Sequence, residues 1–529
     1  MGQMHFDVPD SASDFFAATR WRDAYLCGIE GVPWQTHNKF DGRRFTLARS
    51  VDTSAKLLIT CPVPTIGYRL LTSCSLRCET KPHRLLVELA RGSCFRVRVQ
   101  SDIWRRGGLT LSDAFDDSLS GGMERFIDAA QTADPDRSSE TALEAIVLLE
   151  TAATKLGELF TAQSIAFRKN REHRLSTMLA VSVLPPHPWE SGEDEPADSS
   201  AGGQAGQRTD PASLGQGAVD GPDSLGRAFN AAAVRISWGD VEAASGRFEF
   251  DAVSQALDAC AQQGLRVIGG PLVDYHPRLL PDWLTLFDDD FDRLAATMND
   301  FVEKTVMQFR GRVHLWNAAS GFNTAGPLGL IDEQVMRLSI GAIQTARRCD
   351  PNTPVILSLD QPCGEYLAKD QDGISPFHFA DALLRSGLGL AGIGLNFRFG
   401  FSTGDTHPRS AIEFAQLIDR WSTLNAPLMV QISVAGAPGE DAAAIFRTST
   451  EPLTPDVDGD ATAWSKIQYE FAKPLIDTLL SKQIVHAVVW DGWSDRQPHL
   501  MPHSGLIDSG GRSRPMLDYL RRVREDMLL

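Results

Sequence analysis

The chain has 529 residues, of which 43% are hydrophobic, and its formal net charge at pH 7 is −17. A chain of this length can bury a large core and form more than one domain. The acidic balance and the lack of a Lys/Arg-rich run argue against a nucleic-acid-binding protein. No apolar run approaches the ~20 residues of a membrane-spanning helix, so we expect neither nucleic acid nor a membrane as a partner.

The first residues carry neither a basic segment nor an apolar segment of the kind found in secretory signals, which predicts a cytoplasmic protein. The eight cysteines form no CxxC pair and no Cys/His cluster with zinc spacing. We therefore expect reduced thiols, no metal site and no cofactor.

The first third of the chain predicts two structural units. Residues 1–85 hold short strand-like runs separated by turn signals, which predicts a small β-rich, sandwich-like domain. Residues 86–176 predict a helical segment packed on that domain. One helix face is marked by alternating three- and four-residue spacing at Ile146, Leu149, Ala153, Leu156, Phe160 and Phe167.

The rest of the chain, residues 178–529, begins with an apolar strand at 178–184. Residues 190–221 then contain almost no large apolar side chain, which predicts a disordered insertion. A strand at 231–236 follows, then a helix with Asp251 at its N-cap and Gly264 at its end, and a second strand at 266–270. This strand–helix–strand order predicts a parallel sheet.

Strands and helices continue to alternate to the end of the chain. With the three strands above, the expected strands fill eight positions, the number in a (β/α)8 TIM barrel. The further strands are expected at 312–316, 355–359, 390–395, 427–432 and 485–490, and the helices between and after them at 291–309, 333–348, 376–385, 410–424, 463–480 and 515–524. The predicted fold is therefore an α/β TIM barrel preceded by a small β-rich and helical N-terminal domain.

The first βαβ unit also carries a recognisable pattern, W-x3-E-x3-G-x-F-x-F-D, followed by Leu-Pro-x-Trp. Its residues are Trp238, Glu242, Gly246, Phe248, Phe250, Asp251, Leu280, Pro281 and Trp283. In this pattern, and over about residues 178–529, the chain resembles family 10 glycoside hydrolases, the endo-1,4-beta-xylanase family. The resemblance implies a TIM barrel with an acid/base glutamate after the fourth strand and a nucleophilic glutamate at the end of the seventh.

Both catalytic positions are substituted in this sequence. The motif after the fourth strand runs from Trp316 to Gly321, and Gly321 stands where the family has its acid/base glutamate. At the seventh strand, Gln431 stands where the resemblance implies the nucleophile. Neither residue can perform the task, because retaining hydrolysis needs two carboxyl groups.

Other polar and aromatic side chains are predicted at the C-terminal strand ends, where barrel enzymes place their sites. Asp274, Asp360 and Asp491 are the candidate carboxylates for catalysis. The candidate ligand-binding residues are Trp238, Tyr275, His276, Asn317, Gln361, Asn396, Arg398, Gln431, Trp490 and Trp493.

The sequence leaves several functions open. The first is a catalytically degenerate barrel that binds a carbohydrate, such as a β-glycan or oligosaccharide, at its mouth. The second is an active O-glycosyl hydrolase that uses relocated carboxylates, Asp274 and Asp491. A third is a protein-interaction scaffold. The sequence does not define the oligomeric state.

Overall fold

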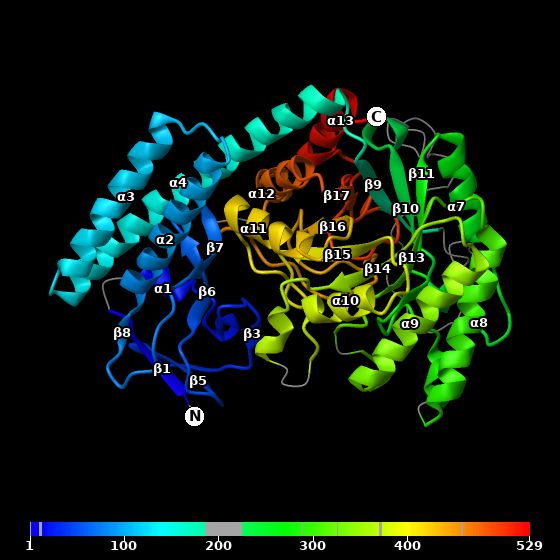
Figure 1. Cartoon of the computed structure of the whole chain (residues 1–529), viewed down its shortest axis with the longest axis horizontal. Coiled ribbons are helices and arrows are strands. Elements are labelled where there is room, and N and C mark those ends of the chain that lie inside the picture. The colour runs from blue at the N-terminus through cyan, green and yellow to red at the C-terminus, as the bar shows by residue number, and fades with distance from the viewer. Residues whose placement is uncertain are drawn as a thin grey trace, which may run out of the picture.

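The structure is a computed structural model, which describes residues 2–9, 13–185, 225–287, 289–324, 326–369, 373–455, 457 and 459–529. Two β-sheets with their helices form the N-terminal region, and a closed barrel with its surrounding helices forms the rest (Figure 1). The insertion predicted to be disordered, residues 190–221, lies outside the described residues.

The N-terminal region contains two four-stranded sheets with a shared apolar core. The first sheet has the order β4 (His37–Phe40), β5 (Arg44–Arg49), β1 (Gly2–Asp7) and β8 (His83–Arg84). The second has the order β3 (Pro33–Trp34), β2 (Tyr25–Cys27), β6 (Lys56–Val63) and β7 (Gly67–Thr72). The short helices α1 (Ser13–Ala17) and η2 (Trp21–Asp23) lie between β1 and β2 in the chain. Alternate strand residues point inward, so both sheets contribute to one buried cluster.

Three helices, α2 (Leu85–Arg106), α3 (Asp113–Gln131) and α4 (Pro135–Glu172), follow the sheets. Helix α4 begins at the N-cap Asp134 with Pro135 in the first turn, and it extends from the N-terminal region to the barrel (Figure 1). Four of the six residues of the predicted helix face are buried, and the Phe160 ring stacks on Trp104 with centroids 4.0 Å apart. Phe167 is 59% exposed and does not share that contact, which corrects its assignment to the buried face.

The barrel is closed and parallel, which confirms the predicted TIM barrel. Its strands are β9 (Met178–Val183), β10 (Ala231–Val234), β11 (Arg266–Gly269), β12 (Val273–Asp274), β13 (Leu315–Ser320), β14 (Val355–Asp360), β15 (Gly392–Phe399), β16 (Leu428–Val434) and β17 (Val485–Trp490). The third strand is in two pieces, β11 and β12, which both pair with β13. The pairing of β17 with β9 joins the last strand to the first.

Two details differ from the sequence prediction. Strand β13 begins at Leu315 rather than at 312 and continues to Ser320, so the fourth strand carries its polar end further along the chain. Helix α7 (Asp251–Gln262) starts at Asp251 itself, and its N-cap is Phe250, which makes no side-chain capping bond.

The longer helices around the barrel, several of which Figure 1 labels, are α8 (Phe291–Phe309), α9 (Asp332–Cys349), α10 (Pro376–Arg385), α11 (Ala411–Ser422), α12 (Ala461–Ser481) and α13 (Pro515–Met527). Shorter helices are α5 (Leu225–Ala228), α6 (Trp238–Val241), η6 (Asp282–Phe287) and η7 (Glu365–Ala368).

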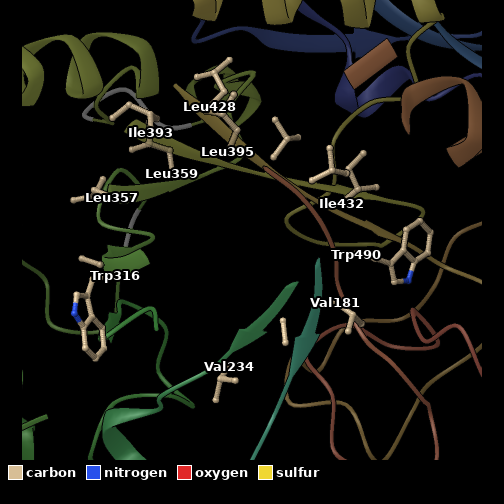
Figure 2. Packing of buried hydrophobic residues seen from close by; sticks show 14 of the residues in the cluster. Val181, Val234, Trp316, Leu357, Leu359, Ile393, Leu395, Leu428, Ile432 and Trp490 are labelled. Carbon is tan, nitrogen blue, oxygen red and sulfur yellow. The ribbon is translucent and has the colours of Figure 1, made fainter. Parts of the chain in front are cut away.

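Successive side chains of each barrel strand point alternately outward, towards the helices, and inward, into the barrel. The outward-facing residues, including Val181, Trp316, Leu359 and Trp490, are buried against the helices in the main core (Figure 2). The residues between them face the barrel interior, because successive strand side chains point to opposite sides. Among the residues that the structure describes, no helix is long and apolar enough to cross a membrane.

Candidate functional site

The interior of the barrel has an apolar layer below a polar one. The apolar layer is a buried cluster of Ala180, Ala231, Ala233, Ile268, Ile356, Met429, Ala487 and Val489. Towards the C-terminal strand ends, which form the barrel mouth, the inward positions become polar. We call this set the polar ring, and it consists of Ser182, Arg235, Asp274, Asn317, Ser320, Ser358, Asp360, Asn396, Arg398, Gln431, Ser433 and Asp491. The polar layer at the mouth is therefore contributed by many different strands, as a barrel site requires.

Asp360, at the end of β14, is the most highly bonded carboxylate of the ring. Arg398 Nη2 lies 2.9 Å from its Oδ2, and Asn396 Nδ2 donates to its Oδ1 at 2.7 Å. The Ser320 hydroxyl lies 3.5 Å from the same Oδ1. Burial alone would raise the pKa of Asp360, but the Arg398 charge and the Asn396 hydrogen bond outweigh it, and the pKa is lowered. Asp360 is therefore an ionised, fixed acceptor at neutral pH.

Asp274, at the end of β12, forms a buried ion pair with Arg235. The distance from Arg235 Nη1 to Asp274 Oδ2 is 2.6 Å, and both residues are nearly inaccessible to solvent. Burial, together with the negative charges of Asp360 and Asp491, raises the pKa of Asp274 to about 6 against the opposing effect of Arg235. Asp274 and Asp360 thus have pKa values shifted in opposite directions, although they belong to one ring.

Asp491 directly follows β17 and is only 1% exposed. The Ser433 hydroxyl donates to its Oδ2 at 2.7 Å, whereas its Oδ1 is buried without a hydrogen-bond partner among the described residues. Such an unsatisfied acceptor is costly to bury. Asp491 is therefore placed deep in the ring, behind the surface that a ligand reaches first.

The two positions that correspond to the catalysts in the resemblance now have a spatial context. Gly321 follows β13 with φ of +80°, and a Cβ built on it would lie 3.8 Å from Asp360 Oδ2. A glutamate here would reach the space that Asp360 occupies from the next strand. Gln431 is half-buried on β16 and pairs in register with Asn396, which itself pairs with Asp360. Strand β14 thus supplies the Asp360 carboxylate beside position 321, while position 431 on β16 carries only the neutral amide of Gln431.

A cavity of about 580 Å³ opens at the mouth beside Asp360. Its barrel side includes five of the predicted site residues, and its other side comes from the N-terminal region. The five predicted residues are Tyr275, His276, Asp360, Gln361 and Arg398. We call the N-terminal contribution, which comprises Arg20, Arg22, Asp23, Ala24, Thr36 and Asn38, the N-terminal wall. The site is therefore shared between the two parts of the molecule.

Two of the predicted residues lie in aromatic stacks. The His276 ring lies 3.8 Å from that of Phe446, which also lines the cavity, and the two planes differ by 24°. Burial lowers the pKa of His276 to about 4, and the Arg398 charge contributes in the same direction, so the imidazole is neutral at pH 7. Tyr275 stacks on Phe322 with centroids 4.8 Å apart. These stacks give the cavity a partly apolar surface among charged groups.

Asn317, Asn396 and Gln431 belong to the polar ring but do not line the cavity. Asn396 acts through its hydrogen bonds to Asp360 and to Ser320, and Asn317 donates to the Ser358 hydroxyl at 2.8 Å. Asp274 and Asp491 also lie outside the cavity lining. Of the three candidate carboxylates, Asp360 alone is among the residues that line it.

The prediction that Trp238 and Trp490 bind ligand at the mouth is wrong. Trp490 is 0% exposed, and its Nε1 donates to Ser504 O at 3.0 Å, because its position on β17 points outward. Trp238 is 2% exposed, stacks on Phe301 and donates to Glu242 Oε2 at 2.8 Å. Both side chains belong to the core between strands and helices.

Trp493 is likewise not a cavity residue. It packs against the main core, where its ring makes an edge contact with Phe229 at 6.3 Å between centroids. Counting alternate residues from Asp491 would have separated Trp490 from the mouth, but Trp493 lies in a loop where alternation gives no guidance.

Several residues of the site were not predicted from the sequence. Asn323 and Tyr366 brace the Asp360 backbone and each other: Asn323 Nδ2 donates to Asp360 O at 2.8 Å, and Tyr366 OH donates to Asn323 O at 2.8 Å. The position of Asn323 just after the fourth strand was a usable signal. Nothing in the local sequence pointed to the N-terminal wall, because its residues lie more than two hundred positions before the strands they face.

Asp441, Asp495 and His499 place possible metal-ligand atoms within 4.8 Å of one another. Asp441 Oδ2 lies 2.9 Å from His499 Nε2 and 3.3 Å from His503 Nδ1. Asp495 is bound by Arg514, whose Nη2 lies 2.7 Å from Oδ2, so a fixed guanidinium already balances one carboxylate. We interpret this group, which we call the loop latch, as an ion-pair network that joins the loops after β16 and β17.

Comparison with known proteins agrees with the resemblance inferred from the sequence. The family model described as "Glycosyl hydrolase family 10" matches residues 217–358. This segment includes β10, β11, β12, β13 and the first part of β14, and therefore Gly321, whereas Gln431 lies beyond it. The chain resembles family 10 glycoside hydrolases.

Individual relatives are distant. "Endo-1,4-beta-xylanase B" of Thermotoga neapolitana is 21% identical over 306 residues, which cover 56% of this chain and 80% of the relative. Among solved structures, native xylanase 10B from Thermotoga maritima matches with a TM-score of 0.47 at 16% identity, covering 69% of this chain and 97% of that one. Xylanase 10B from Thermotoga petrophila RKU-1, solved in complex with xylobiose, has a TM-score of 0.46 at 16% identity, covering 68% and 95%.

Proposed function

We propose that the protein binds a β-linked oligosaccharide in the cavity at the barrel mouth and lacks the hydrolytic chemistry of the family it resembles. The observation that carries this proposal is the pair of substitutions at Gly321 and Gln431. Retaining hydrolysis needs one protonated and one ionised carboxyl on either side of the glycosidic bond. A glycine has no side chain to donate a proton, and an amide forms no glycosyl ester at a useful rate.

The cavity supports the binding half of the proposal. Asp360 and Arg398 present a fixed acceptor and donor, and Asn396 holds the carboxylate from behind. The stacked His276 and Phe446 rings add apolar surface. Ligand sites combine such apolar surface with a few well-placed polar groups, and sugar hydroxyls require donors and acceptors that are already oriented.

Titration calorimetry with xylobiose and xylotetraose tests the binding half. We expect the wild-type protein to bind, and Asp360→Asn to weaken binding by about tenfold, because a charge-assisted acceptor is lost. The matched control is Asp128→Asn, at an exposed position of α3 that does not line the cavity, which should bind as the wild type does. No heat of binding for any β-linked oligosaccharide, with a correctly folded protein, would refute the proposal.

Hydrolysis by relocated carboxylates is the second candidate, and one observation favours it. The pKa of Asp274 is raised to about 6 while that of Asp360 is lowered, and such a divergence is typical of an acid and its ionised partner. An aryl xylobioside provides the test, with Asp274→Asn, Asp360→Asn and Asp491→Asn beside the wild type. Turnover that disappears in one of these variants would establish this second function, and absence of turnover supports binding alone.

A further inference from the structure

The N-terminal wall is held rigidly against the barrel loops. Arg20 Nη2 lies 2.6 Å from Glu451, which belongs to the loop after β16. Asp23 Oδ1 lies 2.9 Å from Lys369 Nζ, close to helix η7. Thr36 N also donates to Ala368 O at 3.0 Å. Because backbone and side chains both bridge the gap, the wall is a fixed boundary of the cavity.

The charges around the cavity are unevenly compensated. Five acidic and five basic side chains line it. Four of the acids each have a close cation: Asp360 with Arg398 at 2.9 Å, Glu365 with Arg409 at 2.6 Å, Asp23 with Lys369 at 2.9 Å, and Glu451 with Arg20 at 2.6 Å. Arg409 is not itself a lining residue, so it adds positive charge from behind the cavity surface.

The fifth acid, Asp405, shares its nearest cation with another acid of the lining. Burial raises its pKa well above its ordinary value, and the neighbouring Glu365 and Glu451 oppose its ionisation as well. Arg20, which already pairs with Glu451, is also the cation nearest to it, with Nη1 3.6 Å from Oδ2. Each of the five acids that line the cavity therefore has a cation within 3.6 Å.

Two arginines have no acidic partner in the described part of the chain. Arg447, in the loop after β16, donates from Nη1 to the carbonyl oxygens of Asp441 at 3.1 Å and Ala442 at 2.8 Å. Arg22, in the N-terminal wall, makes no ion pair among the described residues. Both side chains are exposed, and they line the same cavity from different parts of the chain. In a protein of formal net charge −17, two exposed arginines that line one cavity without an acidic partner in the described part of the chain indicate an anionic ligand.

We propose that the cavity recognises an acidic oligosaccharide, one bearing a uronic-acid carboxylate, through Arg22 and Arg447. This inference rests on the proposed oligosaccharide-binding function and adds the substrate class. Arginine suits the task because its planar guanidinium donates two parallel hydrogen bonds to a carboxylate. The neutral His276 and its Phe446 partner line the same cavity and provide a surface for the uncharged part of the sugar.

The experiment compares two ligands that differ only in charge. Titration calorimetry at fixed ionic strength uses a xylotetraose that carries one glucuronic acid, and the same compound with its carboxylate reduced to an alcohol. We expect the acidic ligand to bind at least about tenfold more tightly, as a charge-assisted hydrogen bond implies. This preference should decrease when salt is raised, because the arginines are exposed to solvent.

Two variants locate the effect. Arg22→Gln and Arg447→Gln should each weaken binding of the acidic ligand by about tenfold and leave binding of the reduced ligand unchanged. Both side chains are exposed, so the variants are expected to fold, and thermal melting checks this. The control Arg137→Gln alters an exposed arginine of α4 outside the cavity and should change neither affinity.

The outcomes separate the two proposals. Equal affinity for the acidic and reduced ligands would overturn the acidic-ligand inference and leave oligosaccharide binding intact. A preference that survives in both arginine variants would also overturn it, because other residues would then supply the recognition. Failure of both ligands to bind would remove the proposed function together with the inference that depends on it.

Discussion

The two faces of the barrel strands follow different rules although they share the same backbone. On the outward face, side chains such as Trp490 and Trp316 are completely buried against the helices. On the inward face at the mouth, the neighbouring position after Trp490 is Asp491, and the residue after Trp316 is Asn317. Adjacent residues thus serve stability and site chemistry separately. Substitutions on the two faces should therefore have effects that can be distinguished by experiment.

The largest expected effect is on the outward face. Trp490→Ala should lower the free energy of unfolding by about 3–5 kcal/mol, because a large buried side chain is replaced by a cavity. Urea denaturation measures the change, and the folded fraction should still bind ligand with the original affinity. The inward control is Gln431→Ala, a half-buried position, which should cost less than about 1 kcal/mol. Equal losses in the two variants would contradict the separation of the faces.

The second prediction concerns a buried ion pair of the inward face. Arg235→Met leaves the Asp274 carboxylate buried without its cation and should cost about 3 kcal/mol or more. The double variant Arg235→Met/Asp274→Asn removes the uncompensated charge and should recover a large part of that loss. Guanidinium denaturation of the single and double variants measures the difference. If the single and double variants are equally unstable, the loss does not come from the uncompensated charge of Asp274, which would contradict the prediction.

Much of the barrel could be predicted from the sequence, because its buried strands are recognisable as short apolar runs. The expected 355–359 and 485–490 agree closely with β14 and β17, and the helix expected at 291–309 coincides with α8. The fourth strand was placed too early. Val313 belongs to the core but precedes the strand, so apolar character alone did not mark where pairing begins.

The site was predicted less well for two physical reasons. The first is that proximity to a strand end does not fix the direction of a side chain, which is why Trp490 was assigned to the mouth while alternation places it outside. The second is that contacts between distant segments leave no local signal. Arg20 meets Glu451 across 431 positions of sequence, which only the tertiary structure reveals. The Asp274, Asp360 and Asp491 set, by contrast, was found from strand ends alone.

A smaller effect on stability is expected at Gly321, the residue that follows the end of β13. Gly321→Ala should cost about 1–2 kcal/mol, because its φ of +80° is unfavourable for a residue with a Cβ. Steric contact adds little, since the nearest atoms to that Cβ lie 3.8 Å away. Thermal denaturation gives the value, with Gly246→Ala as a comparison at another positive φ, 81°, in a solvent-facing turn. A cost near zero would show that the backbone at 321 is free to relax.

The smallest expected effect is on the pH dependence of stability, and it comes from titratable groups in the loops outside the polar ring. In the loop latch, burial opposes the charged form of His499, but hydrogen bonds to Asp441 and Gln497 O outweigh it and raise the pKa of His499 above 6.5. Burial would raise the pKa of Asp441, yet His499 and His503 lower it below 3.8. A raised histidine pKa stabilises the fold below 6.5 and loses this contribution as pH rises through the folded value.

A lowered aspartate pKa has the opposite dependence, because it stabilises above 3.8 and loses the contribution as pH falls. The latch is thus complete between about pH 4 and 6.5, and stability should decrease as the pH rises above 6.5 through the raised pKa of His499. His499→Gln keeps a donor near Asp441 but cannot titrate, so its free energy of unfolding should change less over that range. The control His37→Gln, at an exposed position of β4, should retain the wild-type slope. An unchanged slope in His499→Gln would mean that other groups govern the pH dependence, because the latch histidine would then contribute no proton difference between the folded and unfolded states.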